Sequence, residues 1–361
     1  MEKTKKPLNA RTAAVDIISQ VFEEGAYTNL VLNKFLRNST LSILDRHLVT
    51  ELVYGTVKAK GTLDWYLAAC VNRPLAGVEG KILNTLRVSL YQILYMDRIP
   101  QSAAVNEAVK TARFFGNEGT AKFVNGVLRG FLRKQEANEF VFPDEEKDDA
   151  GYLALKFMHP RWLVKRWLGP HGKENVEKLL AFNNASAPIC LRVNILVASR
   201  EKFLADLEEI KVKAHASSWS KDGIVIDEMP SLMTIFEKFP NSFYIQAESS
   251  MLVADLLNPQ KGECILDLCA APGGKTTHLA QRMENQGEIV ACDVHEHKLK
   301  LIQENAKRLG IKIIKIQLND GTIFQKEWAN KFDRVLGDAP CSGMGVLRRR
   351  AEARWTKDKK D

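Results

Sequence analysis

Short apolar runs that alternate with helical segments from residue 246 onward constrain the fold of this chain more than any other feature. Four runs are typical of β-strands, at 265–268, 288–292, 311–316 and 332–336, and the segments between the first three have helical patterns. Strands separated by helices pair in parallel within a doubly wound sheet. Ligands of such sheets bind at the carboxyl ends of the strands, where the strand order reverses. The sequence therefore predicts an α/β domain with a binding site at that edge.

A loop of small residues follows the first of these strands. The loop, Ala270-Ala-Pro-Gly-Gly274, precedes a helical segment. Residues this small let backbone N–H groups approach a ligand, and a helix N-terminus favours negative charge. A P-loop is the competing interpretation, because Gly274-Lys-Thr276 resembles the end of its pattern. The leading glycine of that pattern would be Cys269, which disfavours it. An ordinary tight turn explains the glycines but not the acids described next.

Acidic residues follow the other three strands. Asp293 ends the second, about twenty residues after the loop, where an acid can hold a pair of ribose hydroxyls. Asp320 follows the third and can accept a hydrogen bond from an adenine amino group. Asp338 follows the fourth, which we expect beside the first, and a carboxylate there can bind the Watson–Crick edge of cytosine. These acids favour a nucleoside-like cofactor beside a site that acts on a flat base.

A thiol lies three residues beyond the last of these acids, in Asp338-Ala-Pro-Cys341. Chemistry at pyrimidine C5 needs a thiolate, since C5 becomes nucleophilic only after addition at C6. The alternative is that Pro340 shapes the loop and Cys341 only packs. The cationic run at 348–350, with Arg354, Trp355 and Lys357, is either a solvated surface or a phosphate contact.

The preceding 245 residues predict two further domains. Residues 1–142 have apolar side chains one turn apart, with Gly and Pro between the runs, which predicts a helical bundle. An acidic stretch at 143–149 is predicted to be a solvated linker. Beyond it, a short helix near Trp162, strands at 191–195 and 224–226, and a helix over 200–210 predict a small α+β module that ends at residue 245. The α/β domain then covers 246–361.

Charge and cysteine content restrict the class of protein. Lys and Arg outnumber Asp and Glu by 52 to 44, for a formal charge of +8, which is compatible with an RNA partner. No apolar stretch is long enough to span a bilayer, and the N-terminus lacks a secretory signal, so we expect a cytoplasmic protein. The six cysteines form no C-x-x-C pair, which argues against a disulfide framework and against a metal site.

These motifs closely resemble the ribosomal RNA small-subunit methyltransferase B family, also called Sun or Fmu, over nearly the whole chain. The most specific are Leu268-Cys-Ala-Ala-Pro-Gly-Gly-Lys275 and Asp338-Ala-Pro-Cys341; Phe123-Val-Asn-Gly-Val-Leu-Arg129 is similar to the antitermination factor NusB. The resemblance implies a NusB-like RNA-binding domain, an α+β RNA-positioning module and a Rossmann-like methyltransferase domain. It also implies a monomer that uses S-adenosylmethionine to methylate C5 of cytosine in 16S rRNA.

The resemblance also assigns roles to residues. Asp293 would bind the ribose, Asp320 would lie by the adenine, and Asp338 would contact both the target cytosine and the cofactor region. Cys341 would assist product release rather than act as the nucleophile. The methionine and ribose side of the cofactor would contact Cys269, Ala270, Ala271, Pro272, Gly273, Gly274 and Lys275.

The chain departs from the family at the nucleophile, which is the cysteine of a later Thr-Cys motif. No cysteine of this chain follows a threonine. We therefore expect a C-terminally truncated methyltransferase domain and little or no methylation by these 361 residues. The alternative function is that of a non-catalytic RNA-binding protein related to antitermination factors, which would bind RNA without regard to S-adenosylmethionine.

Overall fold

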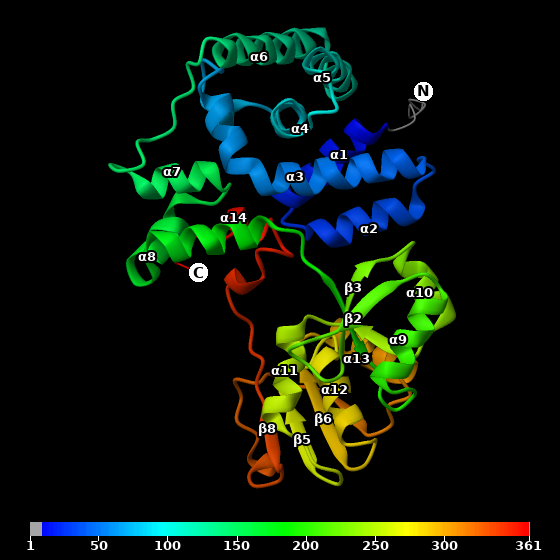
Figure 1. The fold of residues 1–361 in the computed structure, drawn as a ribbon. Helices are drawn as coiled ribbons and strands as arrows, with labels where there is room; N and C mark the ends of the chain where they lie inside the picture. Colours follow the sequence, from blue (N-terminus) through cyan, green and yellow to red (C-terminus); the bar gives the residue numbers. More distant parts are fainter. Residues whose placement is uncertain (1–8, 361) are drawn as a thin grey trace, which may run out of the picture. The chain divides into compact units, whose positions relative to one another are not determined.

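The computed structural model describes residues 9–360 and separates into two compact units. One unit contains residues up to 186 together with 342–360, and the other contains 187–341 (Figure 1). The limits of these two units differ from the domain boundaries expected at 142/143 and 245/246. Residues 143–186 and the segment after Cys341 group with the helical bundle, and the α+β module groups with the parallel sheet.

Six helices of the first unit share one apolar core, as the spacing of apolar residues predicts. Asn9 and Asn117 begin the first and last of them with capping boxes that satisfy the free N–H groups. These helices are α1 (Ala10–Glu23), α2 (Thr28–Asn38), α3 (Ile43–Ala68), α4 (Gly80–Tyr95), α5 (Gln101–Phe115) and α6 (Glu118–Glu136), with the short η1 (Leu75–Gly77) before α4.

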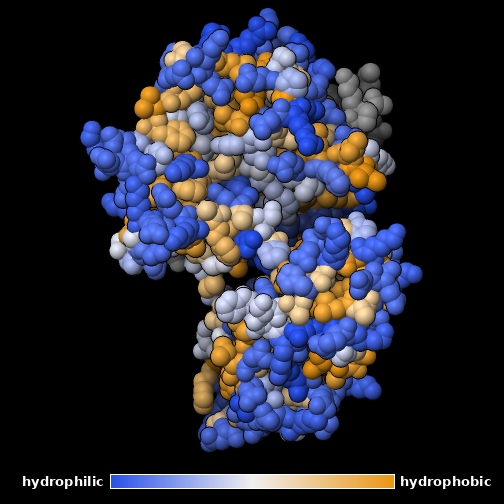
Figure 2. Space-filling view, viewed as in Figure 1, coloured by the Kyte–Doolittle hydropathy of each residue, from blue (hydrophilic) through white to orange (hydrophobic). Residues whose placement is uncertain are grey.

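Two more helices, α7 (Asp149–Lys156) and α8 (Arg161–Asn184), pack on each other in a smaller cluster. The helix predicted near Trp162 is therefore longer than expected. It is broken within its length, because Pro170 cannot continue the hydrogen bonding and Gly172 has φ of 71°. Figure 2 shows polar residues over much of the visible face of this unit, with apolar patches between them. None of the helices within residues 9–360 is long and apolar enough to cross a membrane.

Residues 342–360, the C-terminal segment, are anchored to the helical unit. The segment contains η3 (Met344–Val346) and α14 (Ala353–Thr356). Arg354 is fully buried and donates hydrogen bonds to the carbonyl oxygens of Met158 and Asn183 and to the side chain of Asn184. Both interpretations of the cationic run, solvated surface and phosphate contact, are therefore wrong for Arg354. Its guanidinium donates to acceptors inside the protein, and the spacing of apolar residues in the sequence does not reveal these acceptors.

The second unit begins with a four-stranded antiparallel sheet of order β2-β3-β1-β4. Its strands are β1 (Ile189–Val193), β2 (Lys213–Ala216), β3 (Gly223–Glu228) and β4 (Phe243–Ile245), with helices α9 (Arg200–Glu209) and α10 (Leu232–Lys238). The first strand stops two residues before the predicted end, because Asn194 turns the chain and its amide donates to the carbonyl oxygens of Asn241 and Leu309.

A parallel sheet of order β7-β6-β5-β8 follows, as the strand–helix alternation predicts. Its strands are β5 (Cys264–Asp267), β6 (Glu288–Asp293), β7 (Ile314–Leu318) and β8 (Arg334–Leu336); its helices are α11 (Glu248–Leu257), α12 (Gly274–Arg282), α13 (Glu296–Arg308) and the short η2 (Lys326–Trp328). The chain winds outward from β5 through β7 and then returns to the other side of β5 as β8. The strand order thus reverses between β5 and β8, which is where such sheets bind ligands.

Candidate functional site

A pocket of about 240 Å³ lies at this reversal, above the carboxyl ends of β5 and β8. Three parts of the chain form it: the end of β4 with the start of α11, the end of β5 with the loop before α12, and the segment after β8. The lining residues are Tyr244, Ile245, Gln246, Ala247, Ser250, Asp267, Cys269, Ala270, Ala271, Pro272, Gly274, Lys275 and Asp338. Six of the seven predicted loop residues therefore line one cavity, and Gly273 is the exception.

The two glycines let the loop pack closely on its surroundings. Gly273 has φ of 96°, and an added Cβ would lie 3.2 Å from the Cα of Ile302 on α13. A Cβ on Gly274 would lie 3.1 Å from the ring of Tyr244. The side-chain amide of Asn305 also donates to the carbonyl oxygen of Pro272, at 2.9 Å. The loop is thus held from both sides, and its backbone lies directly against the pocket.

The last residue of β5, Asp267, is a pocket residue that the sequence analysis did not single out. Its carboxylate is buried; Oδ2 accepts from Thr276 Oγ1 at 2.7 Å, and Oδ1 has no partner among the described residues. Burial raises the pKa of Asp267 to about 6. The sequence does contain a signal for Asp267, because an acid is the last residue of an apolar strand and comes directly before the loop.

Asp267→Asn is expected to flatten the dependence of stability on pH between about 4 and 6. The raised pKa means that the folded state binds this proton more tightly, so wild-type stability falls as pH rises through this window and then stays constant. At pH 7 the variant should be more stable by about 1–3 kcal/mol, given about 1.4 kcal/mol per pKa unit. Urea unfolding of both proteins from pH 4.5 to 7.5 checks this; parallel profiles would contradict it.

The acids after β6 and β7 lie outside this pocket. Asp293 is 8% exposed, and its Oδ1 accepts from the backbone N–H of His295 at 3.0 Å. Asp320 is partly exposed and accepts from both the backbone N–H and the hydroxyl of Thr322, which lower its pKa. The pKa of Cys269 is raised by burial and then by the charges of Asp267, Asp293 and Asp338. Asp293 is near the loop, because the carbonyl oxygen of the preceding Cys292 accepts from the N–H of Ala270 at 2.7 Å.

Asp338 and Cys341 follow β8 by two and five residues, and Asp338 lies next to the loop. The carboxylate of Asp338 is half exposed and forms an ion pair with the ammonium of Lys275, which directly couples the two most specific motifs. Cys341 is exposed and is not among the residues that line the pocket. The pocket thus has a buried acid, Asp267, at the end of β5 and a half-exposed acid, Asp338, at its edge.

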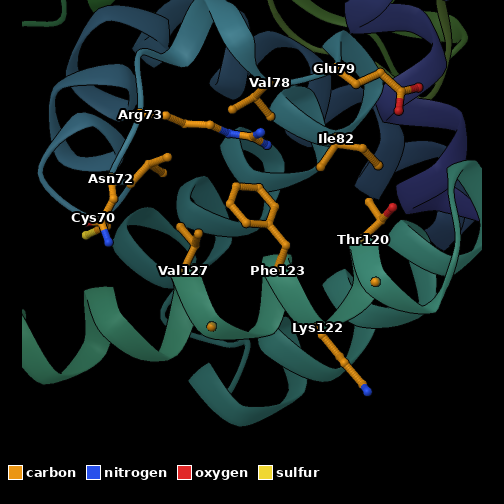
Figure 3. Close-up of a pocket in the computed structure, with 13 residues that line it drawn as sticks. Cys70, Asn72, Arg73, Val78, Glu79, Ile82, Thr120, Lys122, Phe123 and Val127 are labelled. Atoms are coloured by element: carbon orange, nitrogen blue, oxygen red, sulfur yellow. The ribbon is translucent and has the colours of Figure 1, made fainter.

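A second, larger pocket of about 720 Å³ lies in the helical unit, between the turn after α3 and helix α6. Val78, Ile82 and Val127 form apolar walls. Figure 3 shows Arg73 reaching toward the ring of Phe123, with the guanidinium carbon 5.1 Å from the ring centroid. A cation and an aromatic ring in one hollow are features with which proteins bind unpaired nucleotides.

Comparisons with known proteins place these features in a family. The profile described as "16S rRNA methyltransferase RsmB/F" matches residues 254–361, that of the NusB family matches 8–133, and that of the ferredoxin-like domain of RsmF/B-like methyltransferases matches 159–232. The probable ribosomal RNA small subunit methyltransferase B of Bacillus subtilis (strain 168) is 39% identical over 99% of this chain and 78% of its own length. The chain belongs to the ribosomal RNA small subunit methyltransferase B family.

Further relatives agree with this membership. The probable methyltransferase B of Synechocystis sp. is 35% identical over 96% of this chain and 78% of its own length. The crystal structure of PH0851 matches with a TM-score of 0.80 and 25% identity, covering 99% of this chain and 80% of that one. The predicted NusB-like domain, α+β module and Rossmann-like methyltransferase domain are all confirmed.

S-adenosylmethionine is the cofactor of this methyltransferase family, and the residues at the parallel sheet fit it. Oδ1 of Asp267 is a buried acceptor without a hydrogen-bond partner among the described residues, and Asp267 lines the pocket together with the loop. The first turn of α12 supplies N–H groups that suit an anionic amino-acid carboxylate. Asp293, at the end of the neighbouring strand, suits a ribose.

Proposed function

We propose that this site methylates C5 of cytosine in 16S ribosomal RNA. The observation that carries the proposal is that Asp338, in the segment after β8, lines the pocket beside the loop after β5, with the thiol of Cys341 three residues further along the chain. A carboxylate at the edge of a cofactor pocket, with a thiol a few residues beyond it in the chain, suits a pyrimidine that has left its stack. Enzymes that modify a base atom extrude the base, because the atom is inaccessible within a helix.

The residues predicted from the sequence to bind the cofactor keep those roles here. Cys269 to Lys275 border the methionine and ribose of S-adenosylmethionine, Asp293 binds the ribose hydroxyls, and Asp320 lies by the adenine. When bound, this cofactor supplies an electrophilic methyl group. The pocket lining supports the loop assignment. The ribose assignment is supported by the place of Asp293 directly after Cys292, whose carbonyl oxygen accepts from the N–H of Ala270 in the loop at 2.7 Å. For Asp320, only its position two residues after β7 supports the assignment.

Binding of the target cytosine is inferred from the ion pair between Lys275 and Asp338. The ammonium fixes the carboxylate at the edge of the pocket, where Asp338 can accept a hydrogen bond from the cytosine amino group. Addition of a thiolate at C6 makes C5 nucleophilic, and after methylation a base removes the C5 proton. Cys341 then assists expulsion of the enzyme thiol. None of the six cysteines of this chain follows a threonine, so the proposal assigns the nucleophile to a residue other than these.

Trapping on RNA that contains 5-fluorocytosine tests the role of Cys341. Fluorine at C5 blocks the final proton removal, so a nucleophilic cysteine remains covalently attached to the base. With S-adenosylmethionine present, the 361-residue chain should give no adduct on a denaturing gel, and Cys341→Ala should give the same result. An adduct that disappears in Cys341→Ala would instead make Cys341 the nucleophile. Mass spectrometry of any methylated RNA should show 5-methylcytidine; another methylated nucleoside contradicts the proposal.

An RNA partner has support of its own in the helical unit. The pocket at Arg73 and Phe123 combines a cation with an aromatic ring, and the chain carries a formal charge of +8. This observation also favours the second candidate function, that of a non-catalytic RNA-binding protein. The two candidates differ in whether S-adenosylmethionine binds saturably at the parallel sheet.

A further inference from the structure

A fully buried arginine of the α+β module connects several walls of the cofactor pocket. Arg192 lies on β1 and has no exposed surface. Its Nη1 donates to the side-chain oxygen of Gln246 and to the carbonyl oxygen of Gly274. Its Nη2 donates to the hydroxyl of Thr277 at 2.9 Å. The guanidinium carbon lies 5.1 Å from the ring centroid of Tyr244.

Three of these four partners, Tyr244, Gln246 and Gly274, line the pocket. They come from two parts of the same compact unit: Tyr244 lies in β4 and Gln246 follows it, whereas Gly274 begins α12 beside the parallel sheet. A single planar guanidinium therefore fixes the wall contributed by the α+β module and the first helical turn after the loop. A rigid fork with five donors is suited to such a task, whereas a flexible ammonium is not.

Packing alone does not explain this arginine. No carboxylate forms an ion pair with Arg192 among the described residues, and its Nε has no hydrogen-bond partner there. Burial lowers the pKa of Arg192 to about 9. Asp222 favours the charged form of Arg192 without forming an ion pair with it. A buried cation without a carboxylate in direct contact is costly, so an apolar side chain of similar size would serve a purely structural purpose better.

The position of the charge indicates what it does. Arg192 places a positive charge beside the N-terminus of α12, where the free N–H groups of the helix already favour an anion. The amino-acid half of S-adenosylmethionine carries a carboxylate, whereas its nucleoside half does not. The charge and the fixed helical turn thus act on the same half of the cofactor.

We propose that Arg192 is the positioning residue for the amino-acid half of S-adenosylmethionine. The inference rests on the proposed placement of the cofactor in this pocket. It gives the α+β module a role in cofactor binding, because the module supplies the side chain that holds Gly274 and Gln246 in place. Loss of Arg192 should therefore weaken ligands that carry the amino-acid carboxylate more than ligands that lack it.

Two probes separate this role from a structural one. S-adenosylhomocysteine carries the amino-acid group, and 5′-methylthioadenosine does not. By isothermal titration calorimetry on the 361-residue chain, Arg192→Met should weaken S-adenosylhomocysteine by about tenfold to a hundredfold, since charged hydrogen bonds and a favourable charge are lost. The same variant should change the affinity for 5′-methylthioadenosine by less than about threefold.

Arg282→Met is the matched control. Arg282 is also mostly buried in this unit, but it forms ion pairs with Asp222 and Asp255, neither of which lines the pocket. It should destabilise the fold and leave both affinities near wild type. If Arg192→Met fails to fold, Arg192→Lys retains the charge without the fork, and it should weaken S-adenosylhomocysteine selectively by a smaller factor.

The outcomes separate the inference from the proposal on which it rests. A wild-type chain that binds neither probe overturns the placement of the cofactor itself. Wild-type affinity for both probes in the Arg192 variants overturns the positioning role alone. Equal weakening of both probes, or equal effects of Arg192→Met and Arg282→Met, shows that Arg192 supports only the fold and also overturns the role.

Discussion

Asp293→Ala is expected to lower the affinity for S-adenosylmethionine by about a hundredfold or more. Asp293 ends β6, is 8% exposed and directly follows Cys292, whose carbonyl oxygen accepts from the N–H of Ala270 in the loop at 2.7 Å. Two hydrogen bonds from ribose hydroxyls to a carboxylate contribute about 1.5–3 kcal/mol each, which together exceed two orders of magnitude in affinity. Equilibrium binding of labelled cofactor to the 361-residue chain measures the change directly.

Asp333→Ala provides the control for this measurement. Asp333 precedes β8 at the opposite edge of the same sheet, where its carboxylate accepts from the backbone N–H of Cys264 at 2.8 Å. Its loss should affect stability slightly and leave cofactor affinity unchanged. Equal affinity of wild type and Asp293→Ala would remove the ribose assignment. Absence of saturable binding in the wild type would favour the non-catalytic RNA-binding alternative.

Features that depend on local pattern could be predicted from the sequence. The parallel sheet, the position of its last strand beside β5, and the acids after three strands follow from strand–helix alternation and from where each apolar run ends. The loop at Ala270 to Gly274 also follows, because only small residues suit a close backbone approach. Each of these signals lies within a few residues of the feature that it predicts.

Features that depend on distant partners could not be predicted in this way. In Leu191-Arg-Val-Asn194 the polar residues alternate with apolar ones, which indicates a strand with one solvated face. Arg192 and Asn194 are nevertheless buried, because their partners Gly274 and Leu309 lie 82 and 115 residues further along the chain. Period-two alternation separates two faces of a strand, but it does not say whether the second face is covered. The contribution of the α+β module to the pocket was missed for this reason.

Arg354→Met is expected to lower the stability of the helical unit by about 3 kcal/mol. The substitution leaves the carbonyl oxygens of Met158 and Asn183 and the side-chain oxygen of Asn184 without their donor, and each buried polar group left unpaired costs about 1–3 kcal/mol. The wild-type chain must remove the Arg354 guanidinium from water when it folds, whereas the variant does not, and this difference offsets part of the sum. The expected fall in the midpoint of thermal unfolding is about 6–10 °C for a unit of this size.

Arg350→Met is the control for Arg354→Met. It shows whether the loss of stability comes from Arg354 itself or from the removal of any cation in the C-terminal segment. Arg350 is exposed, and its guanidinium carbon lies 4.7 Å from the ring centroid of Tyr27, a contact worth about 0.5–1 kcal/mol. Equal midpoints for the two variants would show that Arg354 does not anchor the segment. The anchor matters for the site because Ser342 follows Cys341 directly, so one end of the thiol-bearing loop is covalently fixed to the segment that Arg354 holds. Arg354→Met should therefore also speed tryptic cleavage after Lys357, and an unchanged cleavage rate would argue against this anchoring.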